Sequence, residues 1–217
     1  MAADRTHDHP GPSRAAEEIA NGLTHFAGFL FGVTVLVLLT VRASVIGSPL
    51  LVVSSAIYGS VLVLLYLAST LYHALPHARM KSVLHFVDRC AIHLLIAGTY
   101  TPFALVAVGG AWGWSLFGAS WGTALLGILW TLFSRRRFSR LSSVWYILEG
   151  WLGVVAIVPF VLRVPPAGLA LVLAGGIAYT GGVAFFHWRT LPFHHAIWHL
   201  FVLAGSAFHF AGLLVSV

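Results

Sequence analysis

Long, continuous apolar stretches constrain this chain more than any other feature of its sequence. A helix needs about 20 such residues to cross the hydrocarbon core of a bilayer. Short loops join seven stretches of this kind, which are roughly residues 20–42, 50–73, 84–108, 113–134, 142–163, 168–187 and 196–216. A membrane β-barrel would instead show segments of about ten residues with alternating polarity. The sequence therefore predicts an all-α integral membrane protein, a bundle of seven transmembrane helices.

The composition agrees with this reading, because only 8% of the residues are charged, against about 25% in soluble domains. One membrane domain is expected, residues 17–217. Residues 1–16 are polar and contain Pro10, Gly11 and Pro12, which is typical of a disordered tail. Ser13 is the expected N-cap of the first helix, because its hydroxyl can accept a hydrogen bond from the first turn.

Basic residues are unevenly divided between the two sets of loops. One set contains only Arg42 and Arg163, whereas the other contains Arg5, Arg14, Arg79, Lys81, Arg135, Arg136, Arg137, Arg140 and Arg189. Loops rich in Lys and Arg stay on the cytoplasmic side of a membrane. We therefore expect a cytoplasmic N-terminus and an outside C-terminus, in the inner (plasma) membrane. The net charge of +6 belongs to these loops and does not indicate a nucleic-acid partner.

Polar side chains gather at one depth of the predicted bundle. His73 ends the second stretch, one helical turn after Ser69, and His195 and His199 open the seventh as H-x-x-x-H. Asp88 lies near the start of the third stretch. Under the predicted orientation these residues share the cytoplasmic leaflet, while the outer halves of the same helices are almost entirely apolar. This one-sidedness predicts a functional site.

The histidines suggest a metal centre. Residues four apart share a helical face, so His195 and His199 can hold one ion and His73 can complete the set. Zinc suits imidazole and takes four ligands, so three histidines leave a position for water, as in catalytic zinc sites. Asp88 is then expected to orient that water or to act as general base, and Ser69 to hydrogen-bond to the water or to a developing oxyanion. An acidic fourth ligand such as Asp88 would instead indicate a structural ion.

Each assignment has a simpler alternative. The histidines can serve packing without a metal, Asp88 can pair locally with Arg89, and Ser69 can hydrogen-bond to the preceding helical turn.

Several other polar residues are assigned no catalytic role. Solvated positions are expected for His77, His85 and His194, and contacts with neighbouring helices for His93 and His209. Glu149 is a candidate for lining a cavity, with no partner assigned.

The order of these motifs resembles the hemolysin III family, the bacterial branch of the progestin and adipoQ receptors. E-x-x-N-x-x-x-H at Glu18, Asn21 and His25 comes first, and S-x-x-x-H, the Asp88 segment and H-x-x-x-H follow over nearly the whole chain. The resemblance implies seven helices, a cytoplasmic N-terminus and zinc near the inner leaflet. Its ligands would be His73, His195 and His199, with Asp88 as the acid and Ser69 as the serine. A more distant similarity to alkaline ceramidases implies hydrolysis of a ceramide-type amide.

Two classes of function follow from this reading. The first is a zinc-dependent intramembrane hydrolase of an acylated lipid amide or ester, with membrane lipid as substrate. The second is a non-enzymatic membrane protein, either a pore former or a receptor-like sensor with structural zinc. A pore should show a polar stripe through the full bilayer, and here the polarity ends in one leaflet. The roles of five further residues stay open: Glu18, Asn21, His25, Glu149 and His209.

Overall fold

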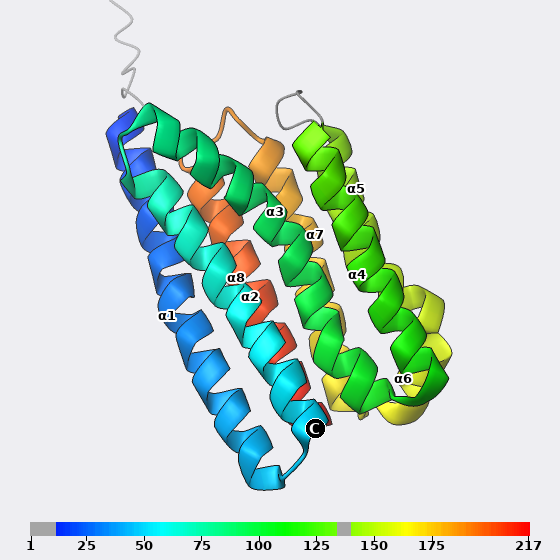
Figure 1. Cartoon of the computed structure of the whole chain (residues 1–217). Coiled ribbons are helices and arrows are strands. Elements are labelled where there is room, and N and C mark those ends of the chain that lie inside the picture. Colours follow the sequence, from blue (N-terminus) through cyan, green and yellow to red (C-terminus); the bar gives the residue numbers. More distant parts are fainter. Residues whose placement is uncertain (1–11, 134–139) are drawn as a thin grey trace, which may run out of the picture.

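The computed structural model describes residues 12–133 and 140–217, and these form a bundle of long helices (Figure 1). In chain order the elements are α1 (Arg14–Ile46), α2 (Pro49–Ala74), α3 (Ala78–Pro102), the π-helix η1 (Phe103–Val108), α4 (Gly110–Phe133), α5 (Arg140–Gly150), the 3₁₀-helix η2 (Leu152–Ala156), α6 (Ile157–Arg163), α7 (Pro166–His187) and α8 (His194–Ser216). Because α3 continues into η1, and α5, η2 and α6 form one further crossing, the elements make seven apolar spans. The predicted seven-helix bundle is confirmed.

The outer surface of the bundle is strongly apolar, as expected for a protein that faces lipid. Large aliphatic side chains lie exposed along the helices, with exposed fractions of 84% at Val45, 78% at Leu162 and 73% at Val155. In water such a surface would drive aggregation, whereas in a bilayer it meets hydrocarbon. The chain is therefore a multi-pass integral membrane protein, located in the plasma membrane.

The helices α1, α2 and α8 form the polar end of the bundle, which is the end that contains His73, His195 and His199. α1 packs closely along α2, and α8 contacts both α1 and α7. The start of α1, the end of α2 and the start of α8 lie at the same end of the molecule (Figure 1). Which side of the membrane this end faces stays a prediction from the loop charges.

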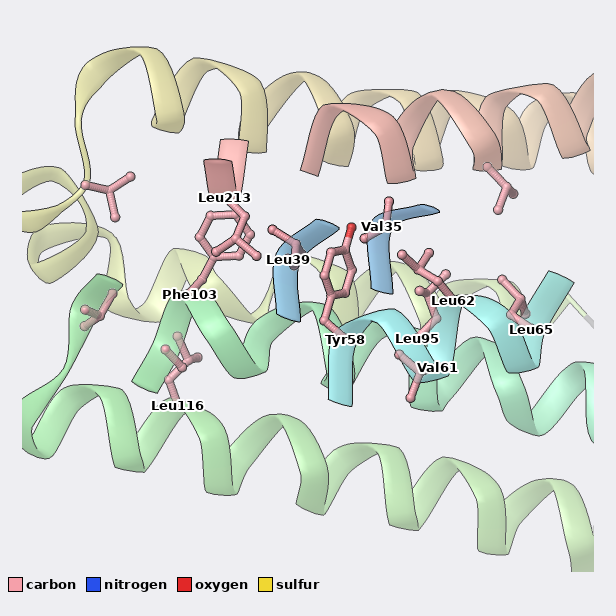
Figure 2. Packing of buried hydrophobic residues seen from close by; sticks show 14 of the residues in the cluster. Val35, Leu39, Tyr58, Val61, Leu62, Leu65, Leu95, Phe103, Leu116 and Leu213 are labelled. Carbon is pink, nitrogen blue, oxygen red and sulfur yellow. The ribbon is translucent and has the colours of Figure 1, made fainter. Parts of the chain in front are cut away.

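Small residues allow α1 and α2 to approach closely. A Cβ atom added at Gly28 would overlap the ring of Tyr66, and one added at Gly59 would lie 2.5 Å from Leu36 Cα. Close backbone approach of this kind supplies packing energy between membrane helices. Figure 2 shows Tyr58 of α2 reaching toward the α1 segments that carry Val35 and Leu39.

The first helix begins earlier than the apolar pattern alone predicts. α1 starts at Arg14, six residues before the expected span, because the Ser13 hydroxyl accepts a hydrogen bond from Ala16 N at 3.2 Å. The N-cap prediction for Ser13 is confirmed. Residues 14–16 of the predicted disordered tail are therefore helical, and residues 1–11 lie outside the described residues. The added turns carry Glu18 into the bundle.

The α-helix is interrupted within the third and fifth spans. α3 ends at Pro102, which cannot donate to the helical ladder, and continues as a π-helix. In the fifth span, η2 interrupts the helix before Pro159. The Tyr100 hydroxyl donates to the Gly150 carbonyl at 2.6 Å and accepts from Gly153 N at 2.8 Å. Irregular backbone at membrane depth needs such partners, so Tyr100 stabilises the break.

A buried polar pair joins the third and fifth spans. His93 Nδ1 lies 2.7 Å from Glu149 Oε2, and each side chain is 3% exposed. The expectation that a neighbouring helix satisfies His93 is confirmed. Glu149, expected as a candidate cavity residue, has a partner that its sequence position does not reveal.

Breaking this pair should destabilise the bundle. Glu149→Leu leaves the His93 imidazole buried without its partner, which costs about 1–3 kcal/mol, so we expect a lower Tm in detergent. The double variant His93→Phe/Glu149→Leu should recover part of the loss, since no unpaired group remains. Leu148→Ala, at a lipid-exposed neighbour, is the matched control. An unchanged Tm for Glu149→Leu would contradict a stabilising role for the pair.

Candidate metal centre

Two helix ends bring three histidines together at the polar end of the bundle. His73 lies in the last turn of α2, and His195 and His199 lie in the first two turns of α8. One nitrogen from each ring lies within 4.8 Å of the others. The ring centroids are 5.2 Å apart for His73 and His195, 5.3 Å for His73 and His199, and 4.5 Å for His195 and His199. This spacing suits a single ion between the rings.

The hydrogen bonds of His199 favour metal binding through its other nitrogen. His199 Nδ1 lies 3.2 Å from the Asn21 carbonyl oxygen and 3.1 Å from Thr24 Oγ1. A carbonyl can only accept, so Nδ1 carries the proton and Nε2 keeps its lone pair. Among the described residues Nε2 has no hydrogen-bond partner, although the side chain is 0% exposed.

His73 is held in the same way. Its Nδ1 donates to Glu18 Oε2 at 2.7 Å, while its buried Nε2 has no partner within the described part of the chain. A second hydrogen bond, from Lys81 Nζ to Glu18 Oε1 at 3.1 Å, holds the carboxylate in place. Metal-bound histidines in proteins usually donate their other N–H to a carboxylate or carbonyl. The free nitrogens and their supports therefore fit a bound cation such as zinc.

The predicted acid and serine lie beside this cluster. Ser69 is one turn before His73 on α2 and is buried. Asp88, on α3, lies close to the Ser69 hydroxyl, and Ser69 Oγ makes no hydrogen bond to any described residue. Asp88 also shares a cavity wall with His195. The structure brings all five predicted residues to one end of the bundle, and their catalytic and ligand roles stay predictions.

Two cavities meet near Asp88. The smaller one, about 210 Å³, contains polar groups of His85, Arg189 and His195. The larger one, about 360 Å³, extends between α3, α5 to α7, and α8, and its wall is mainly aliphatic and aromatic. The residues that line both are Asp88, Ile92, Phe186 and Trp198. The pair of cavities thus has a polar end beside the histidines and an apolar body within the bundle.

Sequence comparisons identify the family of this chain. The family model described as Haemolysin-III related matches residues 13–210, which is nearly the whole chain. The chain belongs to this family. No solved structure matches it.

Relatives of this family member include two bacterial proteins. Hemolysin-3 of Bacillus cereus is 46% identical over 201 residues, covering 93% of this chain and 92% of the relative. The Hemolysin-3 homolog of Bacillus subtilis (strain 168) is 45% identical over 191 residues, which cover 88% of this chain and 90% of that relative. The human Monocyte to macrophage differentiation factor is 27% identical over 164 residues, which cover 73% of this chain and 68% of that relative.

Some site residues have surroundings that sequence reasoning missed. Glu18 and Asn21 stand out in the sequence by their spacing, yet nothing in that spacing assigns them to His73 and His199. Thr24 has no sequence signal at all, because Thr is common in membrane helices. His85 and His194, expected at solvated loop edges, line the smaller cavity, because α3 and α8 begin before the predicted spans.

Replacing Glu18 should weaken metal binding without removing a ligand. Glu18→Gln keeps the size of the side chain but replaces the charged acceptor that holds His73 Nδ1–H. Loss of such a supporting group typically lowers metal affinity about 10–100-fold. Competition with a chromophoric chelator measures the affinity, and Ile19→Ala, at the exposed following residue, is the control. Equal zinc affinity in wild type and Glu18→Gln would show that Glu18 does not support the site.

Proposed function

We propose that this protein is a zinc-dependent hydrolase that cleaves an amide or ester bond of an acylated lipid within the membrane. One observation carries the proposal: the three-histidine cluster lies beside a small cavity with polar groups in its wall, and this cavity shares wall residues with a larger, mainly apolar one. An amphiphile whose acyl chain lies in the apolar body would place its polar linkage next to Asp88 and His195. Substrate pockets of this kind position a ligand by a few polar groups in an apolar wall.

The residues then have separate tasks. His73, His195 and His199 would hold the ion, and a bound Zn²⁺ supplies Lewis acidity for polarising a carbonyl and activating water. Asp88 would accept the proton of the attacking water and pass it to the leaving amine or alcohol. The buried Ser69 hydroxyl would donate a hydrogen bond to the developing oxyanion. The apolar helices around the cavity limit access of bulk water.

Fatty-acid release tests this proposal directly. Purified zinc-loaded protein is incubated with a ceramide, a monoacylglycerol and a phospholipid, and free fatty acid is measured by mass spectrometry. We expect release from at least one substrate, loss of release after zinc removal with a chelator, and recovery when zinc is added back. Absence of release from every lipid by fully zinc-loaded protein would contradict hydrolysis.

The names of the two bacillary relatives favour a second candidate, membrane permeabilisation. A dye-release assay with the protein in liposomes distinguishes the two functions. A hydrolase should leave the dye enclosed, whereas a pore former should release it without any fatty acid. The wall of the larger cavity is mainly apolar, which suits an acyl chain better than a column of water, and this favours the hydrolase.

A further inference from the structure

His25 is a buried imidazole with no hydrogen-bond partner in the part of the chain that the structure describes. Its side chain is 1% exposed, and neither Nδ1 nor Nε2 bonds to any residue in the described ranges. A polar group buried in an apolar protein within a membrane is costly unless something satisfies it. His73 and His199 each have one ring nitrogen hydrogen-bonded to a neighbour and one directed to the proposed metal site. Neither explanation accounts for the two unpaired nitrogens of His25 among the described residues.

The position of His25 suggests what could satisfy it. The ring stacks on His199, with centroids 3.4 Å apart and planes inclined by 19°. It meets Tyr66 edge-on at 5.2 Å, and these two contacts fix its orientation. His25 also forms part of the wall of the larger cavity. The unpartnered imidazole therefore stands where the cavity reaches the histidine cluster.

Asn21, on the same face of α1, adds a second group that is unpartnered among the described residues. Its Oδ1 is buried without a partner among the described residues, and it lies one turn before His25. Residues four apart share a helical face. The Asn21 backbone carbonyl already holds His199, so this turn of α1 is fixed against the cluster.

A second histidine in the cavity wall is differently placed. His209 Nε2 lies 3.1 Å from the Val172 carbonyl oxygen, and only Nδ1 has no partner within residues 12–133 and 140–217. It follows His199 by ten residues along α8, or about 15 Å of helix. His209 thus lines the same cavity well away from the cluster and provides a matched comparison.

We infer that His25 binds the polar group of the cavity's ligand and selects a group that both donates and accepts hydrogen bonds. A neutral imidazole offers one donor and one acceptor, which matches a secondary amide or a hydroxyl. An ester offers acceptors only, and it leaves one nitrogen of His25 unsatisfied. The inference rests on the proposed function in taking the ligand to be an acylated lipid, and it assigns amides as the preferred linkage. His25 is a specificity-determining residue beside the metal ligands.

Equilibrium binding of two radiolabelled lipids tests this inference without turnover. The probes are N-palmitoylethanolamine, which has an amide and a hydroxyl, and methyl palmitate, which has the same acyl chain and an ester. Zinc-loaded wild-type protein at 4 °C should bind the amide at least roughly tenfold more tightly than the ester, because the ester leaves one nitrogen of the buried His25 unpaired. His25→Phe keeps the ring stacking and should bind both probes with similar Kd, while its zinc content stays unchanged.

Two further variants complete the test. His25→Gln retains a donor and an acceptor and should restore part of the amide preference, whereas His209→Phe should keep it in full. An amide preference that survives in His25→Phe, or that disappears only in His209→Phe, would overturn the inference. Zinc loss in His25→Phe would also overturn it, because His25 would then act by supporting His199. A wild-type amide preference without fatty-acid release would contradict the proposed hydrolysis and leave the role of His25 standing.

Discussion

Purified protein with His199→Ala should contain no stoichiometric zinc and should release no fatty acid. His199 is the most buried member of the cluster, and its Nδ1 contacts with Asn21 and Thr24 point Nε2 toward the other two rings. Loss of a supporting group alone lowers metal affinity about 10–100-fold, so removal of a ligand should exceed this range. Inductively coupled plasma mass spectrometry after gel filtration gives the zinc content.

The control for this experiment is His77→Ala. His77 is exposed at the start of α3, so its replacement removes an imidazole without touching the cluster and should leave one zinc per chain. Full zinc content in His199→Ala would show that the three histidines do not form the binding site.

Asp88→Asn should keep zinc and lose hydrolysis. The amide has nearly the size of the carboxylate but cannot accept a proton, and general-base catalysis contributes about 10²–10⁴-fold to rates. We therefore expect fatty-acid release to fall by at least about 100-fold at unchanged zinc content. Both quantities are measured on the same preparation, the first by mass spectrometry of free fatty acid.

Ser143→Ala is the matched control for Asp88→Asn. Ser143 also lines the larger cavity but bonds to His187, at 3.0 Å, so its loss should leave release largely intact. Release that survives in Asp88→Asn would remove the assigned role of the carboxylate. Simultaneous loss of zinc would make Asp88 a ligand, and the ion would then be structural.

The sequence predicts the spans and the histidine cluster because both depend on local patterns. An apolar stretch of about 20 residues has few other solutions in a membrane, and the spacing of His195 and His199 places them on one face of any helix. His73 meets them because the second and last spans bring their ends to the same depth.

The surroundings of the cluster depend on how the helices are rotated against each other, which local patterns do not reveal. Glu18 reaches His73 only because the Ser13 cap extends α1 beyond its apolar part. The pairing of His93 with Glu149 depends on α3 and α5 facing each other. The larger cavity is equally a product of packing, because it lies between spans that are distant in the sequence.

The division of the three histidines between α2 and α8 has a consequence for biogenesis. The ribosome makes α8 after the other six spans, so the complete set of imidazoles does not exist until that helix has been synthesised and has entered the bilayer. A cation that needs all three rings can therefore be acquired only by the finished bundle, and a chain truncated before α8 should emerge from synthesis unable to retain it.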